Sequence, residues 1–146
     1  MQDTIAVCRS CGAKNRIPAV KQHLHPKCGK CGTSLDMRAA AVPVDLEDSF
    51  FADFINKATL PMMVDFFSPT CGPCQMLVPV VANLAKTFAG RAIIAKLDTS
   101  RNPAVASRYR IRGVPTLIFF RNGQIVEQIT GAVPESSLAA TLQRFL

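Results

Sequence analysis

From residue 42 onward, the hydrophobic positions of the chain follow the periods of strands and helices. Short apolar runs that end at turn residues are typical of buried strands, and Asn-Gly between two such runs is typical of a hairpin turn. These signals predict five strands, near residues 42–44, 62–67, 92–97, 116–120 and 124–130.

Between these runs, apolar residues recur at helical spacing and predict four helices, near residues 48–57, 72–88, 102–109 and 135–145. We expect Asp48 or Asp45 to cap the first helix, and Asn102 followed by Pro103 to begin the third. The resulting order, β-α-β-α-β-α-β-β-α, predicts an α/β fold with a mixed sheet covered by helices on both faces.

Residues 1–35 show little hydrophobic periodicity and contain two Cys-x-x-Cys-Gly motifs instead. Sixteen residues separate the first pair, Cys8 and Cys11, from the second, Cys28 and Cys31, a spacing typical of zinc sites. Each glycine can adopt a positive φ and close the turn around its pair. We therefore predict one zinc ion held by four cysteines in a closed structural site that stabilises this short segment.

The cysteine pattern leaves alternatives at this site. The four residues could form two disulfides or remain free thiols, and His23 or His25 could replace one cysteine ligand. The chain begins without an apolar signal segment and has no apolar run of about 18 residues, so we expect a cytoplasmic protein with no membrane span. The predicted divisions are a zinc-ribbon-like domain at 1–36, a linker at 37–42 and a second domain at 43–146.

A third Cys-x-x-Cys motif, Cys71-Gly72-Pro73-Cys74, lies where a buried strand is followed by a helix. Unpaired N–H groups and the dipole at a helix N-terminus stabilise a thiolate, which is the reactive form of cysteine. We expect Cys71 to be the nucleophile and Cys74 to resolve the mixed disulfide. The alternatives are a second metal site or two inert thiols.

Two charged residues lie in the predicted buried strands. Asp65 should have a raised pKa because burial disfavours its charged form, and it is a candidate proton acceptor for Cys74. Lys96 on a neighbouring strand is the candidate countercharge. The alternatives are a structural buried aspartate and a lysine that merely extends to solvent.

Residues 42–146 resemble the thioredoxin family in a series of ordered motifs. These are Val64-Asp65-Phe66, Cys71-Gly72-Pro73-Cys74, Ala95-Lys96-Leu97-Asp98, Asn102-Pro103, Tyr109-Arg110-Ile111-Arg112-Gly113-Val114-Pro115-Thr116, Phe120-Arg121-Asn122-Gly123 and Gly131-Ala132. With the N-terminal cysteine pairs, the whole chain resembles the zinc-containing thioredoxins. The resemblance implies a five-stranded sheet with four helices, no organic cofactor, protein disulfides as substrates, and recycling by an NADPH-dependent thioredoxin reductase.

The resemblance also implies a cis peptide bond before Pro115 and an apolar substrate-binding patch around the first cysteine. The members of that patch are Gly72, Pro73, Val114, Pro115, Gly131 and Ala132. The chain departs from the family at Thr70 and Phe67, where tryptophan is usual, and it contains no tryptophan at all. This departure concerns the partners and the redox potential rather than the chemistry.

The net charge of +7 is concentrated in residues 1–38, which contain seven Lys or Arg and two acidic residues. A basic segment permits an alternative function as a module that docks on nucleic acid or on a partner. We expect no contact with nucleic acid, because four zinc-bound thiolates offset part of this charge and residues 1–35 contain no Phe, Tyr or Trp to stack on bases. A zinc-linked redox switch is a further alternative, and the expected state is a monomer.

Overall fold

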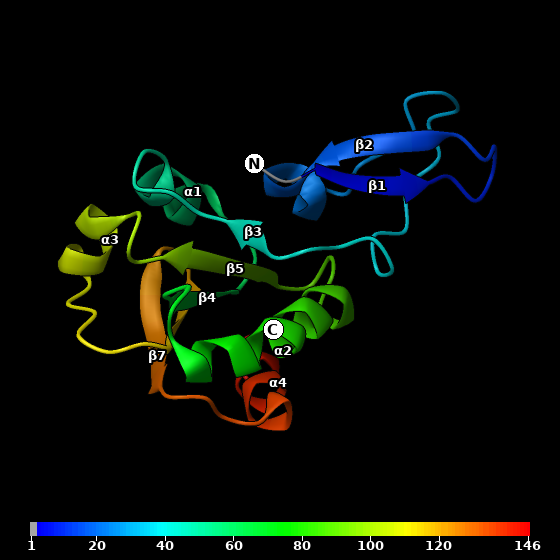
Figure 1. Cartoon of the computed structure of the whole chain (residues 1–146). Helices are drawn as coiled ribbons and strands as arrows, with labels where there is room; N and C mark the ends of the chain where they lie inside the picture. The colour runs from blue at the N-terminus through cyan, green and yellow to red at the C-terminus, as the bar shows by residue number, and fades with distance from the viewer. Residues whose placement is uncertain (1–2) are drawn as a thin grey trace.

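The computed structural model describes residues 3–146 and contains a mixed five-stranded sheet (Figure 1). The spatial order is β3-β5-β4-β6-β7, in which β3, β5 and β4 are parallel and β6 and β7 are antiparallel to their neighbours. The strands are β3 (Val44–Asp45), β4 (Met62–Phe67), β5 (Ile93–Asp98), β6 (Thr116–Arg121) and β7 (Gln124–Thr130). The predicted number and kind of strands are thus confirmed.

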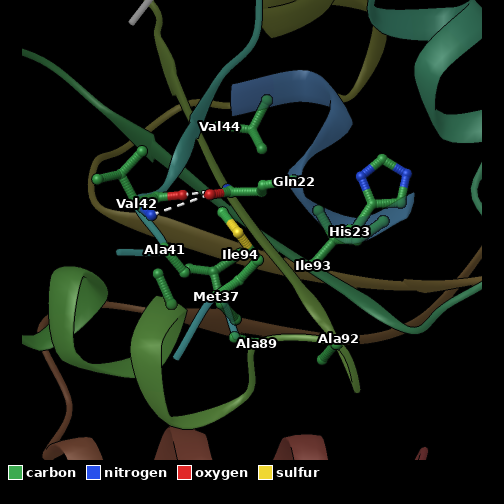
Figure 2. Close-up of a pocket in the computed structure, with 12 residues that line it drawn as sticks. Gln22, His23, Met37, Ala41, Val42, Val44, Ala89, Ala92, Ile93 and Ile94 are labelled. Atoms are coloured by element: carbon green, nitrogen blue, oxygen red, sulfur yellow. Dashed lines mark hydrogen bonds between the residues drawn. The ribbon is translucent and has the colours of Figure 1, made fainter. Parts of the chain in front are cut away.

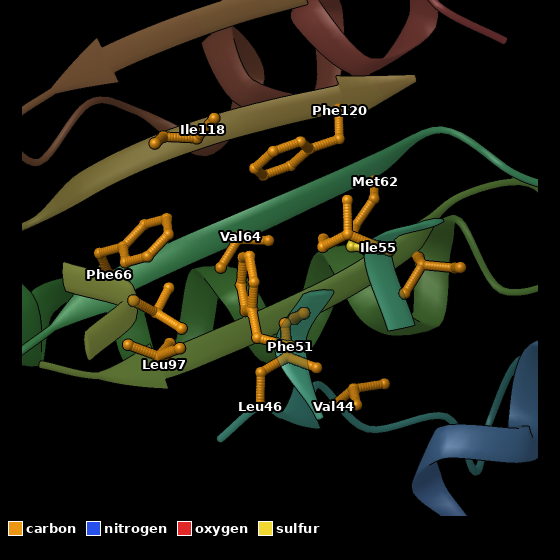
Figure 3. Packing of buried hydrophobic residues seen from close by; sticks show 13 residues of the cluster. Val44, Leu46, Phe51, Ile55, Met62, Val64, Phe66, Leu97, Ile118 and Phe120 are labelled. Atoms are coloured by element: carbon orange, nitrogen blue, oxygen red, sulfur yellow. The ribbon is translucent and has the colours of Figure 1, made fainter. Parts of the chain in front are cut away.

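Four helices cover the two faces of the sheet (Figure 1), as expected from the sequence. Helices α1 (Phe51–Lys57) and α3 (Pro103–Arg108) cover one face, and α2 (Gly72–Thr87) and α4 (Glu135–Gln143) cover the other. On the first face, the aromatic rings of Phe51, Phe66 and Phe120 pack together (Figure 3). On the second face, leucines of α2 and α4 bury apolar residues of β4, β5 and β6.

The hairpin turn between β6 and β7 confirms the expectation drawn from Asn122-Gly123. Both residues have positive φ, 53° for Asn122 and 77° for Gly123. Two successive positive φ values match the right-handed twist of the paired strands, and Asn-Gly reaches them at low cost. This turn brings β7 back to the edge of the sheet.

The N-terminal segment folds into a hairpin of β1 (Asp3–Val7) and β2 (Lys14–Pro18), followed by the 3-10 helix η1 (Ala19–Leu24). Sequence periodicity did not reveal this hairpin. The inward positions of β1 hold the small residues Thr4 and Ala6, whereas Ile5 and Val7 point outward and are 50% and 58% exposed. The usual contrast between a hydrophobic inner face and a polar outer face is therefore absent.

A side-chain amide joins the N-terminal segment to the edge of the central sheet. Gln22 of η1 donates to the carbonyl oxygen of Val42 and accepts a hydrogen bond from the Val42 N–H (Figure 2). Beside this pair, Met37 and Ala89 help to line a cavity of about 20 Å³, room for a single water. The N-terminal segment therefore packs on the side of the sheet where β3 is the last strand.

The expected capping of the first helix is wrong. Helix α1 begins after Phe50, and no side chain caps it. Instead, the carboxylate of Asp48 accepts hydrogen bonds from the Ala104 and Val105 N–H groups at the start of α3, while Asn102 accepts from the Asp48 N–H. Asp48 caps a helix more than fifty residues away because the turn before α1 lies beside the start of α3.

Candidate active site and metal centre

Cys71 and Cys74 form a disulfide at the N-terminus of α2. Cys71 is the residue that caps the helix, and its Sγ accepts a hydrogen bond from the Cys74 N–H at 3.2 Å. Cys74 is buried, with 2% of its surface exposed, whereas Cys71 is partly exposed. An incoming disulfide can therefore reach Cys71 and not Cys74, and the helix N-terminus stabilises negative charge on the Cys71 sulfur.

The loop before β6 lies against this disulfide. The Val114–Pro115 peptide bond is cis, as expected, and the Val114 carbonyl oxygen lies 3.6 Å from the Cys71 Sγ. The Gly131 N–H donates to the Pro115 carbonyl oxygen at 2.9 Å. The segments near residues 71 and 114 thus meet at Cys71, the segment near residue 131 is bonded to the same loop, and Gly72 and Pro73 are exposed beside Cys71.

Asp65 is buried on β4, on the face of the sheet that α2 covers. Its Oδ1 atom has no hydrogen-bond partner. Burial raises the pKa of Asp65 from its ordinary value of 3.8 to about 7, although the positive charge of Lys96 acts in the opposite direction. A carboxyl group with this pKa can take up and release a proton near neutral pH.

Lys96 lies beside Asp65 in the pairing of β5 with β4. Its ion pair, however, is with Asp45 of β3, at 3.6 Å between Nζ and Oδ1. The ion pairs among the described residues include none between Lys96 and Asp65, so Lys96 acts on Asp65 at longer range. Asp45 is the residue near this site that the sequence reasoning missed, because a two-residue strand gives no signal for its register.

The four remaining cysteines come together at the tip of the N-terminal hairpin. The Sγ atoms of Cys8, Cys11, Cys28 and Cys31 all lie within 4.8 Å of one another. The nearest sulfurs across the two pairs are 3.6 Å apart, so these residues are not joined as disulfides. Neither histidine belongs to the cluster, and His23 packs instead against the ring of Phe54 at 5.7 Å.

The two cysteine turns have the same backbone geometry. The Gly12 N–H donates to the Cys8 carbonyl oxygen at 2.8 Å, and the Gly32 N–H donates to the Cys28 carbonyl oxygen at 2.9 Å. Both glycines have positive φ, near 76°. Backbone N–H groups of Cys31 and Lys30 lower the pKa of Cys28 to about 6, and so favour its thiolate. Four sulfurs in this arrangement form a donor set suited to a metal ion that prefers thiolates.

Comparison with known proteins agrees with this geometry. The thioredoxin family model matches residues 42–144, and the model described as "Thioredoxin 2, N-terminal" matches residues 7–33. The chain belongs to the thioredoxin family. It is therefore a thiol-disulfide oxidoreductase whose active site contains the third Cys-x-x-Cys motif.

Individual thioredoxins show how far the similarity extends. Thioredoxin C-3 of Corynebacterium nephridii is 37% identical over 97% of this chain and 95% of its own length. The chloroplastic M-type thioredoxin of Spinacia oleracea is 42% identical over 70% of this chain, which spans 56% of the spinach protein. A solved mutant thioredoxin from Halobacterium salinarum NRC-1 has a TM-score of 0.61 at 36% identity, covering 71% of this chain and 90% of that one.

The N-terminal extension of this thioredoxin is matched in the Corynebacterium protein, which aligns over nearly the whole chain. The solved structure and the spinach protein match only 71% and 70% of this chain. Among the described residues, no helix is long and apolar enough to cross a membrane. The two matching family models together cover both the redox pair Cys71–Cys74 and the N-terminal cluster of four cysteines.

Proposed function

We propose that this thioredoxin reduces protein disulfides through Cys71 as nucleophile and Cys74 as resolving cysteine. The proposal rests above all on the difference in exposure of the two cysteines at the N-terminus of α2. In the reduced protein, the Cys71 thiolate attacks one sulfur of a substrate disulfide and displaces the other sulfur as a thiolate. The product is a mixed disulfide between Cys71 and the substrate.

The second step closes the disulfide seen in the structure. Cys74 loses its proton and attacks the Cys71 sulfur, which displaces the remaining substrate sulfur as a thiolate. Two electrons and two protons pass to the substrate, and Cys71–Cys74 becomes oxidised. Asp65 accepts the Cys74 proton in this proposal, because it is buried on the face of the sheet that α2 covers and has a pKa near neutral pH. Lys96 is its countercharge.

Substrates bind in this proposal at the surface around Cys71. An extended segment of the substrate lies against the backbone of Val114, as in recognition by strand addition. The exposed Gly72 and Pro73 and the partly exposed Gly131 complete this surface without side chains that would select one sequence, and the buried Pro115 lies beneath it. A surface of this kind suits a reductase with many protein substrates.

The metal in this proposal is zinc, one ion held by Cys8, Cys11, Cys28 and Cys31. The supporting observation is the donor set itself, four sulfurs that converge with no further ligand residue near them among the described residues. Zinc would supply a closed tetrahedral link between the two cysteine turns and would hold the hairpin in place. Two of the cysteines form part of the small core of this segment, which contains few large residues.

We extend the proposal to the protein's surroundings. Free metal-binding thiols need a reducing compartment such as the cytoplasm. An NADPH-dependent thioredoxin reductase would return Cys71–Cys74 to the dithiol form, and the protein would act as a monomer. Its units would be residues 1–36 for zinc binding, a linker at 37–42 and residues 43–146 for redox chemistry.

The test uses reduction of insulin by the zinc-loaded protein with dithiothreitol as the electron source. Cys71→Ser should abolish turnover, and Cys74→Ser should form a stable mixed disulfide with the substrate instead. The matched control is Cys11→Ser, which alters the cysteine cluster and leaves the redox pair intact, so turnover should persist. Full turnover by Cys71→Ser would refute the mechanism.

A further inference from the structure

One row of side chains crosses the whole sheet on the face covered by α2 and α4. Residues that pair directly on neighbouring strands point to the same face. In the order β3-β5-β4-β6-β7, the row consists of Asp45, Lys96, Asp65, Leu117 and Ile129. Three of its five members therefore form a line of alternating charge, negative, positive and negative, that runs from the sheet edge toward its centre.

The two carboxyl groups on either side of Lys96 differ in their surroundings. Asp45 lies at the edge of the sheet with 43% of its side chain exposed, and it is the carboxylate that contacts the Lys96 ammonium group. Asp65 is buried, and one of its oxygens lacks a hydrogen-bond partner. The ammonium group of Lys96 therefore lies toward solvent, although an unpaired carboxyl group is buried on its other side.

The other charged groups around Lys96 are engaged elsewhere or make no contact with it. A groove of about 550 Å³ beside Lys96 is also lined by Glu47, Asp48, Asp98 and Arg101. The Asp48 carboxylate accepts hydrogen bonds from N–H groups at the start of α3, and the Asp98 carboxylate accepts hydrogen bonds from Ser100. Lys96 of β5 is the charged group that acts on Asp65, whose carboxyl group is buried on the face covered by α2, the helix that carries the redox pair at its N-terminus.

We propose that Asp45 is a positioning residue, which holds Lys96 toward the sheet edge and so limits the positive charge that acts on the buried carboxyl group of Asp65. The inference rests on the proposed function only where it concerns the rate of the reaction. Two geometric features support it: the Asp45–Lys96 contact and the placement of Lys96 between two carboxyl groups in one register. A backbone hydrogen bond from the Leu46 N–H to the Lys96 carbonyl oxygen, at 2.9 Å, keeps the two strands in this register.

The consequence for Asp65 has a definite sign. Without the Asp45 charge, Lys96 is free to move toward Asp65 and favours its ionised form more strongly, because an opposite charge favours ionisation. Asp45→Asn should therefore lower the pKa of Asp65, and Lys96→Met should raise it. This makes the strength of the proton acceptor depend on a residue that contacts neither cysteine.

The experiment follows the side-chain carboxyl carbon of Asp65 by ¹³C NMR as a function of pH, in the full-length, zinc-loaded, oxidised protein. The Asp65→Asn variant identifies the signal. We expect Asp45→Asn to lower the titration midpoint by about 0.5 to 1 pH unit. The matched control is Glu47→Gln, which removes a negative charge from the same groove without removing a contact of Lys96, and it should shift the midpoint by less than about 0.2 unit.

A double variant decides whether Asp45 acts through Lys96. In a Lys96→Met background, Asp45→Asn should shift the midpoint by less than about 0.2 pH unit, because the group that it positions is gone. An equal shift with and without Lys96, or no shift in either background, would overturn the proposal. If Asp45→Asn shifted the midpoint only by loosening the structure, the shift would be the same with and without Lys96.

A second measurement separates this proposal from the proposed role of Asp65. The rate of closure of the Cys71–Cys74 disulfide in the mixed disulfide is followed against pH for the same variants. If the NMR midpoint moves and the rate profile moves with it, both proposals stand. If the NMR midpoint moves and the rate profile does not, Asp65 is not the proton acceptor, whereas the influence of Asp45 on Asp65 is confirmed.

Discussion

Replacing Asp65 by asparagine should stabilise the protein, and more so at high pH than at low pH. The reason is that Asp65 is 4% exposed and one of its oxygens has no partner, so its charged form is poorly accommodated. Asparagine has nearly the same shape and cannot ionise. The substitution therefore removes the cost of a buried charge and leaves the packing under α2 nearly unchanged.

The size of the effect follows from the pKa of Asp65. Folding raises this pKa from 3.8 to about 7, so the folded state binds the proton more tightly than the unfolded state. Stability therefore falls as pH rises through the window between these two values. At about 1.4 kcal/mol per unit, the loss is about 2 kcal/mol at pH 5.5 and about 4 kcal/mol at pH 8.5. Asp65→Asn should thus gain about 2 kcal/mol more at pH 8.5 than at pH 5.5.

The assay is unfolding of the oxidised protein by guanidinium chloride, followed by far-UV circular dichroism at both pH values. The matched control is Asp53→Asn on α1, whose carboxylate is 66% exposed and pairs with Lys57. This control should show no gain that depends on pH. An equal gain for Asp65→Asn at pH 5.5 and pH 8.5 would refute the reasoning, because it would show that ionisation of Asp65 does not contribute.

Three other outcomes are expected. Asp48→Ala should lower the free energy of unfolding by about 1 to 2 kcal/mol in denaturant titrations, because Ala104 and Val105 at the start of α3 lose their acceptor. Asp65→Asn should slow insulin reduction by about tenfold at pH 7 and by much less at pH 9, where hydroxide can remove the Cys74 proton. Removal of the proposed metal by a chelator should collapse the NMR amide dispersion of residues 3–35 and leave that of the central sheet unchanged, since in our proposal metal ligation supports the hairpin.

The sequence was sufficient to predict the central sheet because its elements follow ordinary periods. Buried strands such as β4 are continuously apolar apart from Asp65, and α2 has its apolar residues at helical spacing. The cysteine spacing likewise predicted that Cys8, Cys11, Cys28 and Cys31 would converge. In each case the information lies within one short stretch or in the spacing of a rare residue type.

The N-terminal hairpin escaped prediction because its small core combines the sulfurs of Cys8 and Cys28 with only a few large apolar residues. Small residues such as Ala6 fit against those sulfurs, and the larger Ile5 and Val7 are left outside. Buried and exposed residues do alternate along β1, but the buried residues are the small ones and the exposed residues are the large ones. Hydrophobicity along the chain gives little signal for a core that is this small and depends partly on cysteines.

The pairing of charges escaped prediction for another reason. Asp45 meets Lys96 and Asp48 meets the start of α3 only because β3 and the turn after it lie beside β5 and the loop that follows. Such contacts join residues about fifty positions apart, and a single sequence contains no signal for the register of a two-residue strand. The positions of Asp65 and Lys96 were predictable, but the choice of partner by Lys96 was not.

The two hydrogen bonds between Gln22 and Val42 bear on the exposure of the sheet edge. An open sheet edge offers free N–H and C=O groups to the strands of other molecules, and proteins commonly block such edges. Here one side-chain amide occupies both backbone groups of Val42, next to the last strand, β3 (Figure 2). The cysteine-bearing segment therefore also lies beside this edge, and a chain shortened to its redox portion would lose that cover.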